Sequence, residues 1–325
     1  MDLQSRWYGR PGILRLLWPV ELLYRSVMWI RRFAYAHKWF SVADCPVPVV
    51  VVGNITVGGT GKTPLVQALV QHLQASGWNP AIISRGYGRT GTQILAVTAQ
   101  SQADAVGDEP LLLFRRTGVP VYVGAQRVAV LRQLLAAHPQ VDVVISDDGL
   151  QHLALARVLD IVLIDATRRL GNGHHLPVGP LREGPERLDS ALVIYHGDVT
   201  EVPATAYRMC LQALEPVPLY PSEEWVATRQ VAAFAGIGHP QRFFNQLRLF
   251  GYTVEAHPRP DHYVYGPEDF ANIRFPVLMT EKDAVKCQGL APSGSAFIPV
   301  EAVVSLGVWV HLDQVLRHWR KSHAG

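Results

Sequence analysis

The chain has 325 residues, of which 48% are hydrophobic and 18% charged, and its formal net charge at pH 7 is +3. The hydrophobic content excludes global disorder, and the length allows one large domain or two modest ones. A charge this small gives no reason to expect a nucleic-acid partner, and the three widely spaced cysteines fit neither a disulfide framework nor a zinc site.

Residues 1–40 differ in composition from the rest of the chain. They carry seven basic against two acidic side chains and four of the eight tryptophans. Apolar side chains recur every three or four residues, as on one face of an amphipathic helix: Leu16, Val20, Leu23, Val27, Ile30 and Ala34. Tryptophan and arginine suit the lipid headgroup layer, and no apolar run reaches the roughly 18–20 residues that span a bilayer. We therefore predict a helix that contacts a membrane surface, with packing of the same helix on the domain as the alternative.

A glycine-rich loop follows the first strongly apolar segment. The valine-rich residues 47–52 predict a buried parallel strand, and a helical pattern begins after the loop. A strand, a glycine-rich loop and a helix are the context of a phosphate-binding loop, in which backbone N–H groups surround phosphate oxygens. The expected binding residues are Thr56, Val57, Gly58, Gly59, Thr60, Gly61, Lys62 and Thr63. Lys62 would reach the β- and γ-phosphates, and the Thr63 hydroxyl would bind Mg²⁺.

This phosphate loop (residues 56–63) departs from the usual pattern at one position. The pattern GxxxxGK[ST] requires glycine where this chain has Thr56. Gly58 and Gly59 are the residues that we expect to supply the turn instead. A related group of ATPases carries a signature lysine where this chain has Val57, which weakens that alternative.

Carboxylates follow a second buried strand. The apolar residues 141–146 end in Asp147 and Asp148, and an acid at the end of a hydrophobic strand after a phosphate loop is typical of a magnesium site. Adjacent side chains on a strand point in opposite directions, although this alternation can relax at a strand end. The sequence therefore leaves open which of the two carboxylates faces the metal ion.

Two further loops carry candidate functional side chains. Asp108 precedes an apolar helix, where it either caps the helix or lies beside the phosphate site and accepts a substrate hydroxyl proton. Arg85 and Tyr87 lie between glycines after a predicted strand, which favours a loop that binds an anion or a sugar.

The second half of the chain predicts a separate unit. The composition changes between Leu214 and Trp225, where the proline-rich residues 215–222 are interpreted as a linker, and alternating strand and helix patterns follow. We expect an α/β protein with three parts: an amphipathic helix at 1–40, a phosphate-loop core of α/β/α type at 41–222, and a smaller α/β domain at 223–325 that closes the cleft. The smaller domain would include a closing helix at 312–319. His262 and the segment 280–286 are its polar features, and residue types alone assign no role to either.

Taken together, these segments resemble one family. Seven short segments occur in this order: residues 53–64 (GNITVGGTGKTP), 84–88 (SRGYG), 107–110 (GDEP), 147–152 (DDGLQH), 179–183 (GPLRE), 261–263 (DHY) and 280–283 (TEKD). The set resembles the tetraacyldisaccharide 4'-kinases, the lipid A 4'-kinases of Gram-negative bacteria, from about residue 10 to the C-terminal helix. The family that the chain resembles also departs from the strict phosphate-loop pattern at this position, so Thr56 does not count against the resemblance.

The resemblance implies a function and a set of residue roles. It implies transfer of phosphate from ATP, with Mg²⁺, to the 4'-hydroxyl of a tetraacylated glucosamine disaccharide 1-phosphate. It further implies peripheral or shallow attachment to the cytoplasmic face of the inner membrane. Asp108 would be the catalytic base paired with His262, and Lys62 would neutralise the transferring phosphoryl group. Arg85 and Tyr87 would touch the lipid headgroup, and Asp147 and Asp148 would serve the metal ion. Arg182 and Glu183 are weaker candidates for that metal site.

Two other functions share part of this pattern. A phosphate-loop ATPase or GTPase that drives assembly or metal insertion would use the same loop and acids without a lipid, and it would turn over ATP without an acceptor. A non-catalytic nucleotide-binding module at the membrane would leave Asp108 and the segment 261–263 without a role.

Overall fold

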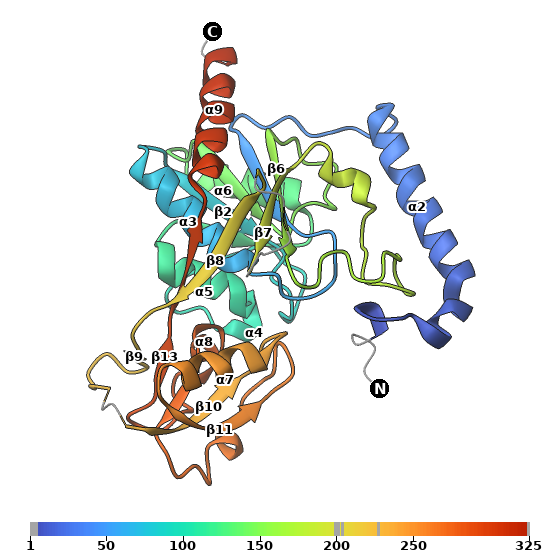
Figure 1. The fold of residues 1–325 in the computed structure, drawn as a ribbon. Coiled ribbons are helices and arrows are strands. Elements are labelled where there is room, and N and C mark those ends of the chain that lie inside the picture. Colours follow the sequence, from blue (N-terminus) through green and yellow to red (C-terminus); the bar gives the residue numbers. More distant parts are fainter. Residues whose placement is uncertain (1–5, 198–201, 203–204, 226–227, 324–325) are drawn as a thin grey trace.

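A nine-stranded sheet forms the centre of the computed structural model, which describes residues 6–197, 202, 205–225 and 228–323 (Figure 1). The strand order is β14-β8-β7-β6-β1-β5-β2-β4-β3. The strands are β1 (Val49–Gly53), β2 (Pro80–Ser84), β3 (Leu95–Ala96), β4 (Val121–Val123), β5 (Val143–Asp147), β6 (Leu159–Asp165), β7 (Leu192–His196), β8 (Tyr207–Ala213) and β14 (Val300–Val304). The seven inner strands run parallel, and only the edge strands β3 and β14 pair antiparallel.

Helices cover both faces of this sheet, as the valine-rich β1 requires. Val50 and Val52 belong to one buried cluster, and Val49 and Val51 belong to another. The first cluster is covered by α3 (Lys62–Ala75), α5 (Asp108–Thr117) and α9 (Leu306–Ser322), and the second by α6 (Arg127–Ala137). The strand is therefore buried on both sides, which explains its continuous apolar sequence and agrees with the expected α/β/α core.

A second, five-stranded sheet forms the lower unit of Figure 1. Its order is β11-β10-β12-β13-β9. Its elements are β9 (Val217–Pro218), β10 (Gln230–Ala235), β11 (Thr253–Pro258), β12 (Val277–Thr280), β13 (Ala296–Ile298), α7 (Pro240–Leu249), η3 (Pro267–Asp269) and α8 (Glu281–Cys287). This unit has two buried clusters of its own, so the expected smaller α/β unit is present.

The expected range of 223–325 for that unit needs correction at both ends. β9 already pairs with β13, so the smaller sheet begins before residue 223. Strand β14 pairs with β8 of the large sheet, and Leu312 and Leu316 of α9 lie in the core of the large unit. The chain therefore returns to the first unit after β13, because β14 satisfies the free edge of β8 and α9 covers apolar side chains of the large sheet.

Helix α2 (Trp18–Ala36) stands at the side of the large unit, after the short η1 (Gly12–Leu17) (Figure 1). Pro19 lies in its first turn, where a missing N–H group costs nothing. Its inner face is polar: the buried Glu21 accepts the backbone N–H of His175 at 2.8 Å, and the hydroxyl of Tyr24 donates to the carbonyl of Arg182 at 2.9 Å. Polar contacts thus attach this helix to the body of the protein.

The apolar face that the sequence predicted for α2 is turned outward. Leu23 is 66% exposed and Val27 is 54% exposed, and Leu16, Val20 and Ile30 are also exposed, whereas Ala34 is buried. Within the described part of the chain, we find no helix with the length and hydropathy needed to cross a bilayer.

Candidate active site

The parallel strands of the large sheet end at one edge, and most of the candidate residues lie on the loops that leave it. The phosphate loop follows β1, the loop with Arg85 follows β2, and Asp148 follows β5. Residues at the carboxyl ends of neighbouring parallel strands are brought together, and ligands of open α/β sheets bind at this edge.

The phosphate loop is arranged around Lys62. Gly61, the N-cap of α3, has φ +88°, a conformation that favours glycine. The ammonium group of Lys62 donates to Oδ1 of Asn54 at 3.1 Å and lies 3.4 Å from Oδ1 of Asp148. The amide of Asn54 in turn donates to the carbonyl of Gly58 at 3.2 Å. Asn54 therefore ties the strand end to the middle of the loop, a role that the sequence analysis did not assign.

Thr56 fits the loop because its segment pairs with residues 179–183. Thr56 forms an antiparallel bridge with Leu181, and its backbone avoids the left-handed region that would require glycine. The N–H of Val57 donates to the carbonyl of Pro180 at 2.9 Å, and the N–H of Arg182 donates to the carbonyl of Ile55 at 2.7 Å. The segment 179–183 therefore supports the start of the phosphate loop.

Asp147 and Asp148 have different surroundings. Asp147 is buried and accepts from the Ser84 hydroxyl through Oδ2 at 3.1 Å, while Oδ1 is buried with no hydrogen-bond partner among the described residues. Burial, followed by the charges of Glu109 and Asp148, raises the pKa of Asp147. Asp148 lies near Lys62 and accepts from Arg182 at 3.2 Å, and although burial opposes them, these two cations lower its pKa. Asp147 thus forms no ion pair with another described residue, although the charge of Lys62 acts on it and partly opposes the rise of its pKa.

Asp108 and His262 meet across the two units. The Nδ1 atom of His262 lies 3.1 Å from both carboxylate oxygens of Asp108, and Asp108 is 5% exposed. Burial alone would raise the pKa of Asp108, but the hydrogen bond with His262 and the charge of Lys282 outweigh it and lower that pKa. The hydrogen bond to Asp108 raises the pKa of His262. Asp108 is therefore a weakened base and His262 a strengthened one.

Two lysines of α8 reach the same pair. Nζ of Lys282 lies 3.8 Å from Oδ2 of Asp108, and Nζ of Lys286 lies 3.9 Å from the same oxygen. Lys282 also forms an ion pair with Glu109 at 2.9 Å. These residues were not assigned from the sequence, although the segment 280–283 was noted there; their significance appears only where α8 packs beside α5.

Loop 85–89 lies next to this pair. Gly86 and Gly107 allow this loop to lie close to the start of α5, because a Cβ atom on Gly107 would stand 3.1 Å from the Cα of Gly86. The ring of Tyr87, which is 65% exposed, has its centroid 4.9 Å from that of His262. Arg85 is exposed on the same loop, and its positive charge contributes to lowering the pKa of the nearby buried Arg127. Tyr87 therefore presents an exposed aromatic surface beside the Asp108–His262 pair.

Two of the candidate residues have a strained backbone. Asp148 has φ +48° and His262 has φ +60°, in the left-handed region that residues other than glycine rarely adopt. Strain of this kind persists only where the surroundings impose it, and it is concentrated at functional sites. Lys38 and Arg169 share this conformation, so the two values by themselves do not single out a functional residue.

Glu183 is already paired within the structure. It accepts from Gln151 at 2.7 Å, and its other oxygen lies 3.3 Å from Nε of Arg187. In the part of the chain that the structure describes, no three or more His, Cys, Asp and Glu side chains form a group able to hold a metal ion by themselves. A metal ion here would therefore need oxygens from a nucleotide or from water as well.

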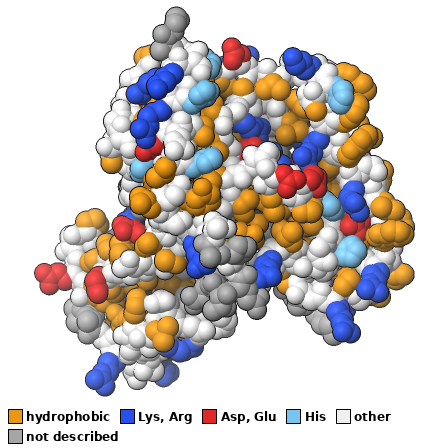
Figure 2. All heavy atoms as spheres, turned by 45° about the horizontal axis from the view of Figure 1, so that its top comes forward, with side chains coloured by type: hydrophobic (Ala, Val, Ile, Leu, Met, Phe, Trp, Pro, Cys, Tyr) orange, Lys and Arg blue, Asp and Glu red, His pale blue; other side chains and the backbone are white. Residues whose placement is uncertain are grey.

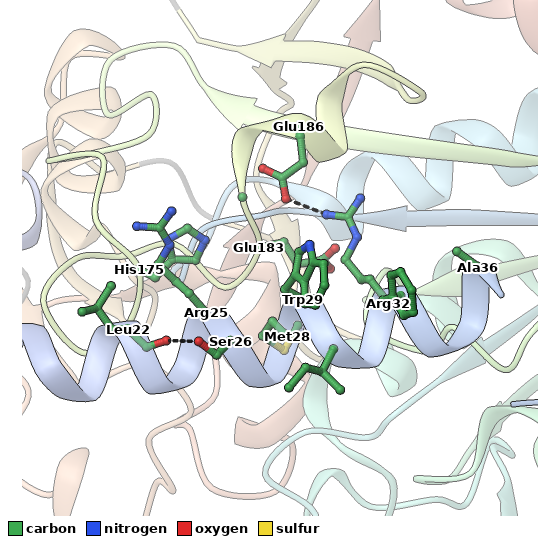
Figure 3. Close-up of a pocket in the computed structure, with 13 residues that line it drawn as sticks. Leu22, Arg25, Ser26, Met28, Trp29, Arg32, Ala36, His175, Glu183 and Glu186 are labelled. Atoms are coloured by element: carbon green, nitrogen blue, oxygen red, sulfur yellow. Dashed lines mark hydrogen bonds and ion pairs between the residues drawn. The ribbon is translucent and has the colours of Figure 1, made fainter. Parts of the chain in front are cut away.

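A groove of about 900 Å³ separates α2 from the loop at residues 183–186 (Figure 3). Trp29 and Phe33 form apolar walls of the groove. An ion pair of 2.7 Å between Arg32 and Glu186 joins its two sides. Figure 2 shows hydrophobic side chains along the right-hand edge of the molecule, where η1 and α2 lie. Glu183 lines the groove and also belongs to the segment 179–183, which supports the phosphate loop. The groove beside α2 therefore lies near the phosphate loop.

These features define a phosphate-loop phosphotransferase: the core is an α/β/α arrangement around a parallel sheet, and the phosphate loop and an Asp–His pair lie at the same edge of that sheet. A sequence model of one such family, described as tetraacyldisaccharide-1-P 4'-kinase, matches residues 13–317. The chain belongs to this family of kinases.

Individual relatives support this assignment. The chain is 45% identical over 308 residues to the tetraacyldisaccharide 4'-kinase of Methylobacillus flagellatus, covering 93% of this chain and 92% of that one. It is 49% identical over 309 residues to the protein of the same name from Alkalilimnicola ehrlichii, covering 93% and 92%. The crystal structure of LpxK from Aquifex aeolicus in complex with ATP superposes with a TM-score of 0.79 at 26% identity, covering 94% of this chain and 99% of that one. The expected α/β fold with parallel sheets is thereby confirmed.

Proposed function

We propose that this chain transfers the γ-phosphoryl group of ATP to the 4'-hydroxyl group of a tetraacylated glucosamine disaccharide 1-phosphate. The observation that carries the proposal is the Asp108–His262 contact at the sheet edge that holds the phosphate loop. Such a pair can take the proton of an attacking hydroxyl group, and the family match over residues 13–317 supports a lipid alcohol rather than water as the acceptor.

The nucleotide side of the reaction would be served by the phosphate loop. Residues 56–63 would surround the phosphates with backbone N–H groups at the start of α3. Lys62 is already held at this position by Asn54 and Asp148, so its charge is placed before the nucleotide arrives. The hydroxyl of Thr60, buried without a hydrogen-bond partner among the described residues, is a further donor for a phosphate oxygen. Charge neutralisation of this kind is the main requirement of phosphoryl transfer.

The acceptor side would be served by His262. The sequence interpretation placed the base on Asp108, but the opposite pKa shifts of the two residues favour the imidazole. In the proposed step the 4'-hydroxyl proton moves to Nε2 of His262 while the alcohol oxygen bonds to the γ-phosphorus. The bond between that phosphorus and the β–γ bridging oxygen breaks, and ADP leaves. Asp108 would hold Nδ1–H and stabilise the imidazolium that forms.

The residues present fit a magnesium ion. The buried Oδ1 of Asp147 has no partner among the described residues, and its neighbours include a second carboxylate, as a cation site requires. Asp147, Asp148 and the hydroxyl of Thr63 would hold the ion, and Glu183 would have to leave Arg187 to join them. When bound, Mg²⁺ neutralises charge on the transferring phosphoryl group.

The acylated acceptor would be reached from a membrane surface. The exposed apolar face of α2 and the basic side chains of residues 1–40 suit an anionic lipid surface, and the groove beside Trp29 leads toward the segment that supports the phosphate loop. Loop residues Arg85 and Tyr87 would contact the headgroup. We place the protein at the cytoplasmic face of the inner membrane, where ATP is available.

One assay tests the proposal directly. The purified protein is incubated with γ-labelled ATP, Mg²⁺ and the acylated disaccharide 1-phosphate in mixed micelles, and the lipid is extracted. We expect a labelled lipid that carries the phosphate at the 4' position. Release of labelled inorganic phosphate at the same rate with and without the acceptor would instead support the ATPase alternative.

A further inference from the structure

Lys282 has no role in the reaction as proposed so far, although it comes from the smaller unit and reaches the reacting pair. It is the second residue of α8, which the Thr280 side chain caps by accepting from the N–H of Asp283. Asp283 is fully buried; it accepts from the N–H of Gly236 at 2.8 Å and pairs with Lys286 at 3.0 Å. These contacts fix the first turn of α8, and with it the direction in which Lys282 points.

The ammonium group of Lys282 lies among three acidic residues and one imidazole. Its nearest partners are Oε1 of Glu109 at 2.9 Å and Oδ1 of Asp261 at 3.0 Å, with Oδ2 of Asp108 at 3.8 Å. Its fourth neighbour is Nε2 of His262 at 3.4 Å. The carboxylates raise the pKa of Lys282 despite its burial, so it stays charged at neutral pH.

The chemistry of the two partners determines where the imidazole proton lies. An ammonium group has three donors and no acceptor, so Nε2 of His262 must be the acceptor in this contact. A carboxylate is an acceptor only, so Nδ1 must carry the proton that is donated to Asp108. Oδ1 of Asp261 also approaches Nε2, but at 3.8 Å it is too far away to accept a hydrogen bond. The contacts with Asp108 and Lys282 together therefore select one neutral tautomer of His262.

We propose that Lys282 is a positioning residue that keeps His262 neutral, with its proton on Nδ1 and its free electron pair on Nε2. The inference rests on the proposed function, in which Nε2 accepts the proton of the acceptor hydroxyl. The incoming hydroxyl takes the place of Lys282 at Nε2, and Lys282 remains paired with Glu109 and Asp261.

The charges around His262 explain why such a residue is needed. Asp108 from α5 and Asp261 beside it both favour the imidazolium form, and the Tyr87 ring from the loop after β2 lies against the imidazole with its centroid 4.9 Å away. Two lysines of α8 approach Asp108, but Lys286 lies 3.9 Å from its Oδ2 atom, whereas Lys282 also lies 3.4 Å from Nε2 of His262 and opposes the two carboxylates at the imidazole. Without it the imidazole would be protonated at a higher pH, and fewer molecules would carry a free base near neutrality.

The test compares Lys282→Met and Lys282→Arg with the wild-type protein and with Arg116→Met. Nε of Arg116 pairs with Glu281 at 3.2 Å, so this control also removes an α5–α8 ion pair but leaves the cluster around Lys282 intact. The rate of lipid labelling is measured across pH, with KM for ATP determined separately from kcat. Imidazole ¹⁵N spectra, in which His262→Gln assigns the His262 signal, report the tautomer without any turnover.

We expect Lys282→Met to move the acid limb of kcat/KM, and the titration of His262, upward by about one pH unit. Near neutral pH this gives about a tenfold loss of kcat with KM for ATP unchanged. Lys282→Arg should recover most of the activity, because it restores the charge and the donors, and Arg116→Met should keep the wild-type pH profile.

Two results would overturn the inference. One is an active wild-type protein whose His262 carries its proton on Nε2, and this measurement requires no folded variant. The other is a Lys282→Met protein that binds ATP normally and keeps the wild-type pH profile and ¹⁵N titration. A wild-type protein that labels no lipid would instead refute the proposed function, while the spectra would still test the tautomer.

Discussion

His262 and Asp108 are 154 positions apart in the chain, yet Nδ1 of the imidazole lies 3.1 Å from both oxygens of the carboxylate. One residue follows β11 of the smaller sheet, and the other opens α5 of the larger unit. The contact therefore depends on both units and on how they are placed relative to each other.

The first prediction concerns Asp108→Asn and pH. The hydrogen bond with Asp108 is the main cause that raises the pKa of His262, so its loss should lower that pKa. Because the base must be neutral, the acid limb of kcat/KM should move to lower pH, while kcat at the plateau falls by about 10²-fold through lost positioning. Lipid labelling across pH measures both effects. A limb that stays in place would contradict the assignment of His262 as the base.

Lys62→Ala should lose both turnover and nucleotide affinity. The ammonium group is held in place by Asn54 and Asp148, at the point where the β- and γ-phosphates would lie. We expect a loss of about 10²–10³-fold in kcat together with a weaker Kd for ATP. Isothermal titration with a non-hydrolysable ATP analogue and the labelling assay give the two values. Lys321→Ala, in the exposed last turn of α9, serves as the matched control and should change neither.

Tyr87→Ala should act on the lipid rather than on ATP. The exposed ring lies beside His262, where an acceptor sugar must approach. Loss of one aromatic contact should raise KM for the lipid by about five- to tenfold, with KM for ATP unchanged, and Tyr87→Phe should keep most of the affinity. Equal lipid KM values for Tyr87→Ala and the wild-type protein would remove this residue from the acceptor site.

The exposed face of α2 is tested by a Leu23→Glu/Val27→Glu double variant. Each apolar side chain buried in a lipid surface contributes about 1.5–3 kcal/mol, so co-sedimentation with anionic vesicles should weaken by at least tenfold. Val310→Glu on α9, which is also exposed, is the matched control and should bind as the wild-type protein does. Unchanged sedimentation of the double variant would favour a helix whose function is confined to packing.

These point changes are preferable to removal of residues 1–40. The indole N–H of Trp7 donates to the carbonyl of Pro177 at 3.0 Å, and the buried Glu21 pairs with His174 at 3.0 Å. Deletion would remove these contacts and expose the half-buried segment around His174 and Pro177, which would confound membrane binding with loss of stability.

The sequence by itself determined those parts that short segments encode. Continuous valine in β1, the glycines before Lys62 and the three- and four-residue spacing in α2 specify a strand, a loop and a helix through their own backbone preferences and burial. The ordered motifs also identified the family and the candidate residues Asp108 and His262. Local patterns of this kind persist wherever the segment lies in the fold.

Only the tertiary structure decided which segments meet. Strand β14 has an apolar pattern that would suit either sheet, and its hydrogen bonds to β8 placed it in the large one. The surroundings of Asp108 and His262, and those of Lys282, depend on charges brought in from α5, α8 and the loop after β2. Electrostatic interactions act through space rather than along the chain, so the division of roles between acid, histidine and lysine could be inferred only after folding had brought them together.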